Sequence, residues 1–190
     1  MAAATADAGE LNEQQQRTLL DLARRTIEQY VHDRTLPDLP TGDAAFEPQR
    51  AVFVTLHKHG ELRGCIGSLE PHMPLAEAVR SSAVSAATQD PRFPAVTPAE
   101  VGELEIEISV LSPLREVASP DEITVGEHGV VVSEGMRRGV FLPQVATEQG
   151  WDRDTMLTYL CAHKAGLPPD AWQHGCDLAV FTTQVFSEGD

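Results

Sequence analysis

The chain has 190 residues, of which 42% are hydrophobic, so it is long enough for one domain with its own core or for two packed lobes. Its 29 acidic residues against 14 basic ones give a formal net charge of -15, which disfavours a nucleic-acid partner and binding to anionic membranes. Three widely spaced cysteines, Cys65, Cys161 and Cys176, do not suit a disulfide framework or a four-cysteine zinc site.

The first ten residues are small and mostly polar, and they lack the charged and apolar regions of a signal peptide. We therefore expect residues 1–10 to be a disordered tail and residues 11–190 to form a single domain that could divide into two lobes. No segment resembles a transmembrane run, so the expected location is cytoplasmic.

The first half of the chain predicts a helix, a hairpin and a second helix. Residues 13–33 carry apolar residues at helical spacing, and Asn12 is a suitable cap. Residues 51–57 and 62–69 predict two strands joined by a turn at His59-Gly60. The helix that begins near Pro74 has small residues beside its apolar stripe, so we expect something to pack closely against it.

The second half predicts further strands and a long helix. Residues 103–110 alternate between apolar and polar residues, as a half-buried strand does. A second hairpin turns near Gly135, a helix follows over residues 152–166, and a last strand spans residues 177–186. Because strands and helices do not alternate one for one, this order predicts an α+β fold with a mainly antiparallel sheet and packed helices.

The segment LRGCIG, residues 62–67, is the first candidate site. Glycines weaken a strand, so Gly64 and Gly67 indicate that either a helix or a ligand approaches the backbone closely. Cys65 could be a small buried side chain or a nucleophile. Arg63 next to it could stabilise a thiolate, or bind a carboxylate or phosphate. Either use suits a pocket.

A nucleophilic thiol needs a base, and His57, His59 and His72 are the local candidates. A two-residue turn pairs His57 with Leu62 and Cys65 with Val54, which places His57 on the opposite face from Cys65. A β-bulge would reverse this, and glycines favour bulges. The histidine spacing matches no recognised metal site, and we expect neither a metal nor a cofactor.

The segment DPRFP, residues 90–94, is the second candidate. Two prolines restrict its backbone, so it is either a rigid corner with Phe93 in the core or a loop that brings Arg92 to the same site as Arg63.

LRGCIG and DPRFP, followed in order by LEIEISVLSP, FLPQVATEQGWD and LCAHKAGL, resemble the AMMECR domain family over roughly residues 13–186. Ala95 stands where that family often has a second proline. The resemblance implies a larger and a smaller lobe with a cleft between them, lined by the motif segment. It implies one site wall formed by Arg63, Gly64, Cys65, Ile66 and Gly67. It implies a second wall formed by Asp90, Arg92 and Phe93.

The resemblance also implies partners, because relatives occur in AmmeMemoRadiSam systems beside a Memo-like protein and a radical-SAM protein. Two functions remain open at this point. The chain could bind an anionic small molecule, with Cys65 as candidate nucleophile, or it could be a non-catalytic adaptor. A nucleic-acid-linked regulator is disfavoured by the charge.

Overall fold

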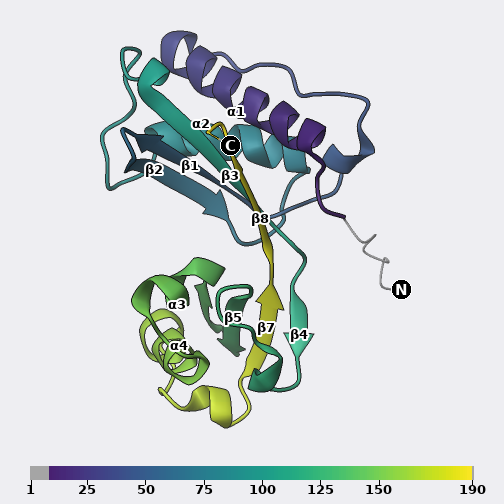
Figure 1. The fold of residues 1–190 in the computed structure, drawn as a ribbon, viewed down its shortest axis with the longest axis vertical. Helices are drawn as coiled ribbons and strands as arrows, with labels where there is room; N and C mark the ends of the chain where they lie inside the picture. The colour runs from purple at the N-terminus through teal and green to yellow at the C-terminus, as the bar shows by residue number, and fades with distance from the viewer. Residues whose placement is uncertain (1–8, 190) are drawn as a thin grey trace. The chain divides into compact units, whose positions relative to one another are not determined.

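The computed structural model describes residues 9–189 and divides the chain into two compact units, each with its own hydrophobic core (Figure 1). One unit comprises Met1–Leu111 and Gln184–Asp190, and the other comprises Ser112–Thr183. The tail predicted for residues 1–10 lies almost wholly outside the described residues. Within the described part of the chain, no helix is both long enough and apolar enough to cross a membrane.

The first unit contains two helices and a four-stranded sheet. The helices are α1 (Glu13–Asp33) and α2 (Leu75–Thr88). The strands are β1 (Val52–Lys58), β2 (Glu61–Ser68), β3 (Leu104–Leu111) and β8 (Thr183–Ser187), in the order β2-β1-β3-β8. Short 3-10 turns lie at Ala44–Phe46 and Val101–Glu103. Strand β2 is therefore an edge strand.

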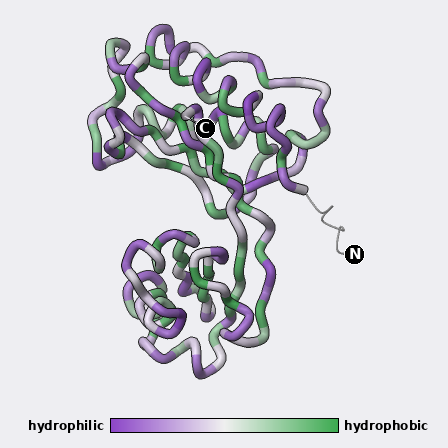
Figure 2. The backbone as a smooth tube through the Cα atoms, viewed as in Figure 1, coloured by the Kyte–Doolittle hydropathy of each residue, from purple (hydrophilic) through white to green (hydrophobic). Residues whose placement is uncertain are grey.

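Helix α1 begins and ends as its sequence predicts. The Asn12 side chain accepts a hydrogen bond from the backbone N–H of Gln15, and the Gln15 side chain bonds back to the Asn12 backbone, which completes a capping box. Hydrophilic and hydrophobic residues alternate along its turns (Figure 2), so one face enters the core.

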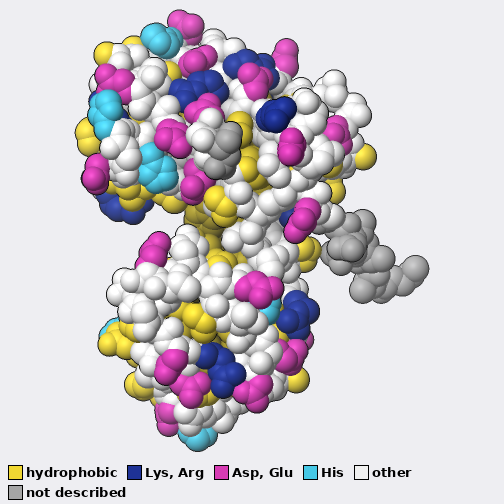
Figure 3. All heavy atoms as spheres, in the orientation of Figure 1, with side chains coloured by type: hydrophobic (Ala, Val, Ile, Leu, Met, Phe, Trp, Pro, Cys, Tyr) yellow, Lys and Arg dark blue, Asp and Glu magenta, His cyan; other side chains and the backbone are white. Residues whose placement is uncertain are grey.

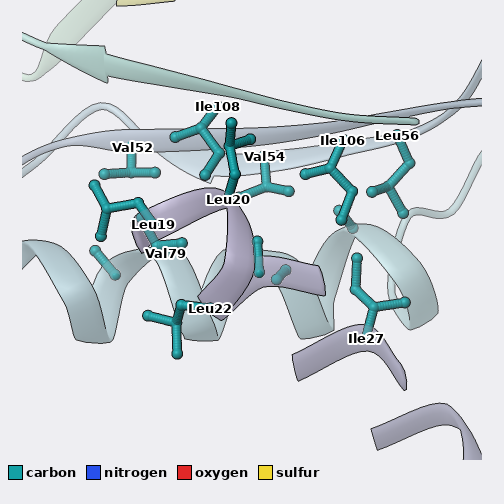
Figure 4. Close-up of a cluster of buried hydrophobic side chains, with 14 of the residues drawn as sticks. Leu19, Leu20, Leu22, Ile27, Val52, Val54, Leu56, Val79, Ile106 and Ile108 are labelled. Carbon is teal, nitrogen blue, oxygen red and sulfur yellow. The ribbon is translucent and has the colours of Figure 1, made fainter. Parts of the chain in front are cut away.

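Both helices cover the same face of the sheet. Figure 4 shows Leu19, Leu22 and Ile27 from α1 and Val79 from α2 beneath the strands, where they meet inward-facing residues of β1 and β3. Those inward residues are Val52, Val54, Leu56, Ile106 and Ile108. The inward side chains of β3 are the apolar set predicted from alternation.

The second unit is a smaller sheet with short helices. Strands β4 (Arg115–Val117), β5 (Gly129–Glu134), β6 (Arg137–Phe141) and β7 (Asp177–Phe181) take the order β4-β7-β5-β6. Helices α3 (Pro143–Gln149) and α4 (Arg153–Tyr159) follow β6, and 3-10 turns lie at Pro120–Glu122 and Ala171–Gln173. The β5–β6, β5–β7 and β4–β7 pairs are antiparallel, as are β1–β2 and β1–β3. The predicted α+β class with mainly antiparallel sheets is confirmed.

The helix expected over residues 152–166 is present between its Asp152 cap and Gly166, but from Leu160 it continues as a π-helical turn, Leu160–Ala165. The backbone of this turn lies so close to Gly139 of β6 that a Cβ there would be 2.7 Å from the Ala165 nitrogen. The strand expected over residues 177–186 is two strands, β7 and β8, which belong to different sheets. An apolar pattern does not reveal a passage between sheets.

Candidate functional site around Cys65

The hairpin β1–β2 contains a bulge that decides where Cys65 points. His57 pairs with Leu62 as predicted, but Cys65 pairs with Thr55 and not with Val54, because the register shifts between Leu56 and His57. Leu62 and Gly64 occupy consecutive pairs, so Arg63 is the extra residue of the bulge. The side chain of Cys65 consequently lies on the face away from α1 and α2.

We call this face the outer face. It carries Phe53, Thr55, His57, Cys65, Gly67, Glu105, Glu107 and Ser109, which alternate with the buried residues of their strands. The bulge places His57 on the same face as Cys65, the reverse of the simple register. In a sheet, such diagonal neighbours are separated by about 7 Å at the Cβ atoms. Within the described residues no hydrogen bond joins His57 to Cys65.

Packing accounts for both glycines of the motif. A Cβ on Gly64 would lie 2.3 Å from the carbonyl oxygen of Ala86, so helix α2 is the close neighbour that the sequence indicated. A Cβ on Gly67 would lie 2.1 Å from the Val52 oxygen and 2.6 Å from the Phe53 ring. Neither glycine requires a ligand to explain it.

The thiol of Cys65 is half-buried and has a hydrogen-bond donor. The hydroxyl of Thr55 lies 3.2 Å from the sulfur, across the β1–β2 pair. The Arg92 guanidinium is the nearest cation that bonds this residue, since it donates to the Cys65 carbonyl oxygen at 3.4 Å. The contact between Thr55 and Cys65 was not predicted from the sequence. It follows from the strand register only when the position of the bulge is known, because the bulge pairs Cys65 with Thr55.

Asp90 and Arg92 together hold the peptide of Cys65. The Asp90 carboxylate accepts the Cys65 backbone N–H at 2.9 Å, while Arg92 donates to the Cys65 carbonyl oxygen at 3.4 Å. Asp90 also accepts two bonds from the Arg92 guanidinium, at 3.0 and 2.7 Å, and one from the Arg92 backbone. The two segments predicted to form the two walls of the site are thus in direct contact.

This clamp is electrostatically strong. The Asp90 side chain is only 2% exposed, yet the hydrogen bond from Arg92 holds the pKa of Asp90 well below its usual range. Burial opposes this shift, and the backbone N–H groups of Cys65 and Arg92 reinforce it. Because Cys65 is on an edge strand, the clamp satisfies backbone groups that the sheet leaves unpaired.

Arg63 has a different role from Arg92. Its guanidinium donates two bonds of 3.2 Å to Glu100, and its side chain is 12% exposed. Glu100 also accepts from the backbone and hydroxyl of Thr97 and from Lys58, so the Arg63 charge is already matched. The hydrogen bond from Arg63 is the largest cause that lowers the pKa of Glu100 to about 2. This ion pair was not predicted from the sequence, in which the two residues are 37 positions apart.

The two remaining predicted residues are Ile66 and Phe93. Ile66 pairs with Val54 and packs against the core on the helix side, not on the outer face. Phe93 is partly buried, and its ring lies 5.5 Å from the Arg92 guanidinium carbon. The side chain of Cys65 therefore lies on the outer face, while that of Ile66 lies on the opposite face of the sheet.

Charged side chains are spread over the face of the molecule that Figure 3 shows. Figure 3 shows Asp and Glu side chains scattered over the visible surface of each unit, with Lys and Arg among them. Among residues 9–189, no three His, Cys, Asp or Glu side chains gather in a group that could hold a metal ion.

Comparison with known proteins identifies the family of this chain. The AMMECR1 family model matches residues 20–186. A protein of Methanothermobacter thermautotrophicus is 45% identical over 189 residues, covering 94% of this chain and 96% of that one. A protein of Methanopyrus kandleri is 46% identical over 181 residues, covering 90% and 86%.

A solved structure has the same fold. The crystal structure of an uncharacterised protein from Pyrococcus horikoshii matches with a TM-score of 0.78 and 38% identity, covering 90% of this chain and 89% of that one. The motifs, the fold and these relatives agree, and the chain belongs to the AMMECR1 family.

Proposed function

We propose that the chain binds an anionic small molecule at the outer face, where Cys65 is a reactive thiol. The observation that carries this proposal is the setting of Cys65, whose sulfur has the Thr55 hydroxyl 3.2 Å away and whose carbonyl oxygen accepts a bond from the Arg92 guanidinium at 3.4 Å. A hydroxyl donor and a nearby cation both stabilise negative charge on sulfur.

Arg92 is the cation that suits an incoming anion. Its side chain is 54% exposed, and its bonds to Asp90 and Cys65 use only two of its three nitrogens. The third nitrogen has two N–H donors for a ligand carboxylate or phosphate. Arg63, in contrast, is largely buried against Glu100 and serves to position the hairpin.

The proposed ligand is a small molecule because few groups are available to contact it. They are one thiol, one hydroxyl and one guanidinium, with His57 on the same face as the local base. An overall charge of -15 repels anions at long range, so recognition depends on this local arrangement.

The experiment compares iodoacetate, an anion, with neutral iodoacetamide. Both alkylate thiols, and mass spectrometry resolves Cys65 from Cys176 in one native sample. We expect a higher ratio of iodoacetate rate to iodoacetamide rate at Cys65 than in free cysteine, and Arg92→Gln should reduce it several-fold. If Cys65 resists both reagents until the chain unfolds, the thiol is a packing residue and the proposal is wrong.

We further propose that the chain acts with Memo-like and radical-SAM proteins. Family membership supports this partnership. Co-expression with both partners and affinity purification of this chain is the test, and failure to recover either partner from a shared extract would contradict it.

An adaptor is the second candidate. The ion pairs of Arg63 with Glu100 and of Arg92 with Asp90 favour an adaptor, because such ion pairs also stabilise a docking surface. Cys65→Ser separates the two functions. An adaptor retains partner binding and biological function with serine, whereas a reactive-thiol protein retains only the binding.

A further inference from the structure

Two of the three cysteines are in contact within the second unit. Cys161 belongs to the π-helical turn that follows α4, and Cys176 directly precedes β7. The S–H group of Cys176 donates a hydrogen bond to the Cys161 sulfur, and both are free thiols. The wide spacing of the cysteines in the sequence did not predict this contact, because it depends on how the chain folds back over the turn.

Other hydrogen bonds hold the two segments together independently of the sulfurs. The ring nitrogen of Trp172 donates to the Thr158 hydroxyl at 3.3 Å, which fixes the 3-10 turn of Trp172 against α4. Thr158 and Cys161 are three residues apart in continuous helical backbone, so they lie on the same side of it. The chain then turns back, because the Cys176 N–H donates to the Ala171 carbonyl oxygen at 3.5 Å.

The two thiols differ in their access to solvent. Cys161 is fully buried in the core of the second unit, whereas Cys176 packs against that core and is partly exposed. Burial raises the pKa of Cys161, and it raises the pKa of Cys176 to about 11. A small oxidant therefore reaches Cys176 first. The reaction is slow at neutral pH, because only the thiolate form of a cysteine is nucleophilic.

We infer that Cys161 and Cys176 are an oxidisable pair that closes a disulfide within the second unit, with a small-molecule disulfide as the oxidant. The Cys176 thiolate attacks one sulfur of that disulfide, which forms a mixed disulfide and releases one small thiol. Cys161 then attacks the Cys176 sulfur, which closes the protein disulfide and releases the second small thiol. Two protein thiols are oxidised and one small disulfide is reduced, and the two protons pass to the released thiols.

The fold favours the second of these steps. Because the two sulfurs are already in contact, attack by Cys161 is intramolecular and needs little further ordering of the chain. A free thiol from solution has to compete with this neighbour for the Cys176 sulfur. We therefore expect the closed disulfide, and not the mixed disulfide, to be the product at equilibrium.

Glutathione is the probe, and the full native chain is incubated with equal concentrations of its reduced and oxidised forms until the products no longer change. Free thiols are then blocked with N-ethylmaleimide in acid, and a tryptic digest is analysed by mass spectrometry without reduction. Cleavage after Arg153 and Lys164 places the two cysteines in separate peptides, residues 154–164 and 165–190. We expect these peptides to be linked in the majority of chains, with a mass equal to their sum less two hydrogen atoms.

This measurement requires no variant, so a folding defect cannot account for its result. If both thiols remain free, or if the product is glutathione attached to Cys176 alone, the inference is wrong. A link from either peptide to residues 64–80, which contain Cys65, would also overturn it.

Single variants test the order of the two steps, and circular dichroism checks that each is folded. Cys161→Ala should stop the reaction at the mixed disulfide on Cys176, because no second thiol is in contact. Cys176→Ala should leave Cys161 unmodified, because that thiol is buried. Cys65→Ala is the matched control and should form the linked peptides to the same extent as the unchanged chain, which separates this inference from the proposal for Cys65. Glutathione on Cys161 in folded Cys176→Ala, or loss of the link in Cys65→Ala, would contradict it.

Discussion

Replacing Gly64 by alanine tests whether helix packing dictates the glycine of the LRGCIG motif. The new Cβ would lie 2.3 Å from the Ala86 oxygen and 3.2 Å from the Ala86 carbon. Ordinary contact begins at 3.4 Å, so helix and strand would have to separate by about 1 Å. Both neighbours are backbone, and no side-chain rotation relieves the clash.

The expected cost follows from two opposing effects. Overpacking of this kind costs about 1–3 kcal/mol. Alanine also restricts the unfolded chain, which returns about 0.4–1 kcal/mol. We therefore expect a net loss of about 1–2 kcal/mol, which lowers the urea midpoint by about 0.5–1 M for a typical denaturant dependence of about 2 kcal/mol/M.

Urea unfolding followed by far-ultraviolet circular dichroism measures this loss, since α1 and α2 dominate the helix of the first unit. Both tryptophans, Trp151 and Trp172, lie in the second unit, so their fluorescence reports that unit separately. Gly102→Ala is the control, because a Cβ there meets nothing within 4 Å. If Gly64→Ala is as stable as Gly102→Ala, helix packing is not the reason for the glycine.

Three further predictions concern charge and thiols. As the pH falls from about 5 to about 2, Glu100→Gln should lose less stability than the unchanged chain. Ionised Glu100 has a pKa of about 2 in the folded chain, so it stabilises the fold fully above about pH 5 and this contribution is lost as the pH falls to about 2. Urea midpoints measured across this range test the prediction, and equal slopes would contradict it. Asp90→Ala should speed amide exchange at Cys65 at least tenfold while β1 stays protected, since the Cys65 N–H donates to Asp90; unchanged exchange would show that the clamp is not closed in solution. Burial raises the pKa of Cys176 to about 11, so its alkylation at pH 8 should be about 100-fold slower than that of an ordinary thiol; mass spectrometry of the labelled chain measures it, and labelling at the rate of free cysteine would refute it.

Local sequence signals predicted the elements of the fold well. Capping residues and apolar spacing located α1 to the residue, and alternation identified the buried side of β3. These features depend on residues a few positions apart. Strands β7 and β8 follow each other in the chain but belong to different sheets. The sheet that a strand joins is decided by residues far away in the sequence, so the division between β7 and β8 could not be predicted from their own residues.

The candidate site was harder to predict because it depends on register and on distant partners. The bulge at Arg63 moves Cys65 from the partner Val54 to Thr55, and two glycines in a strand do not show where a bulge will fall. The carboxylate that neutralises Arg63 comes from Glu100, on a different segment. The Asp90–Arg92 pair is local, but its contact with the Cys65 peptide is not.

The bulge has a consequence for how chains of this kind are compared. One residue added or removed between Gly60 and Leu62 would exchange the two faces of β2, turning the thiol toward the helices and Ile66 toward the outer face. The six letters LRGCIG would remain intact while the sulfur left its position beside Thr55. The length of this hairpin, and not the motif alone, determines whether a relative has its thiol on the same face of the sheet.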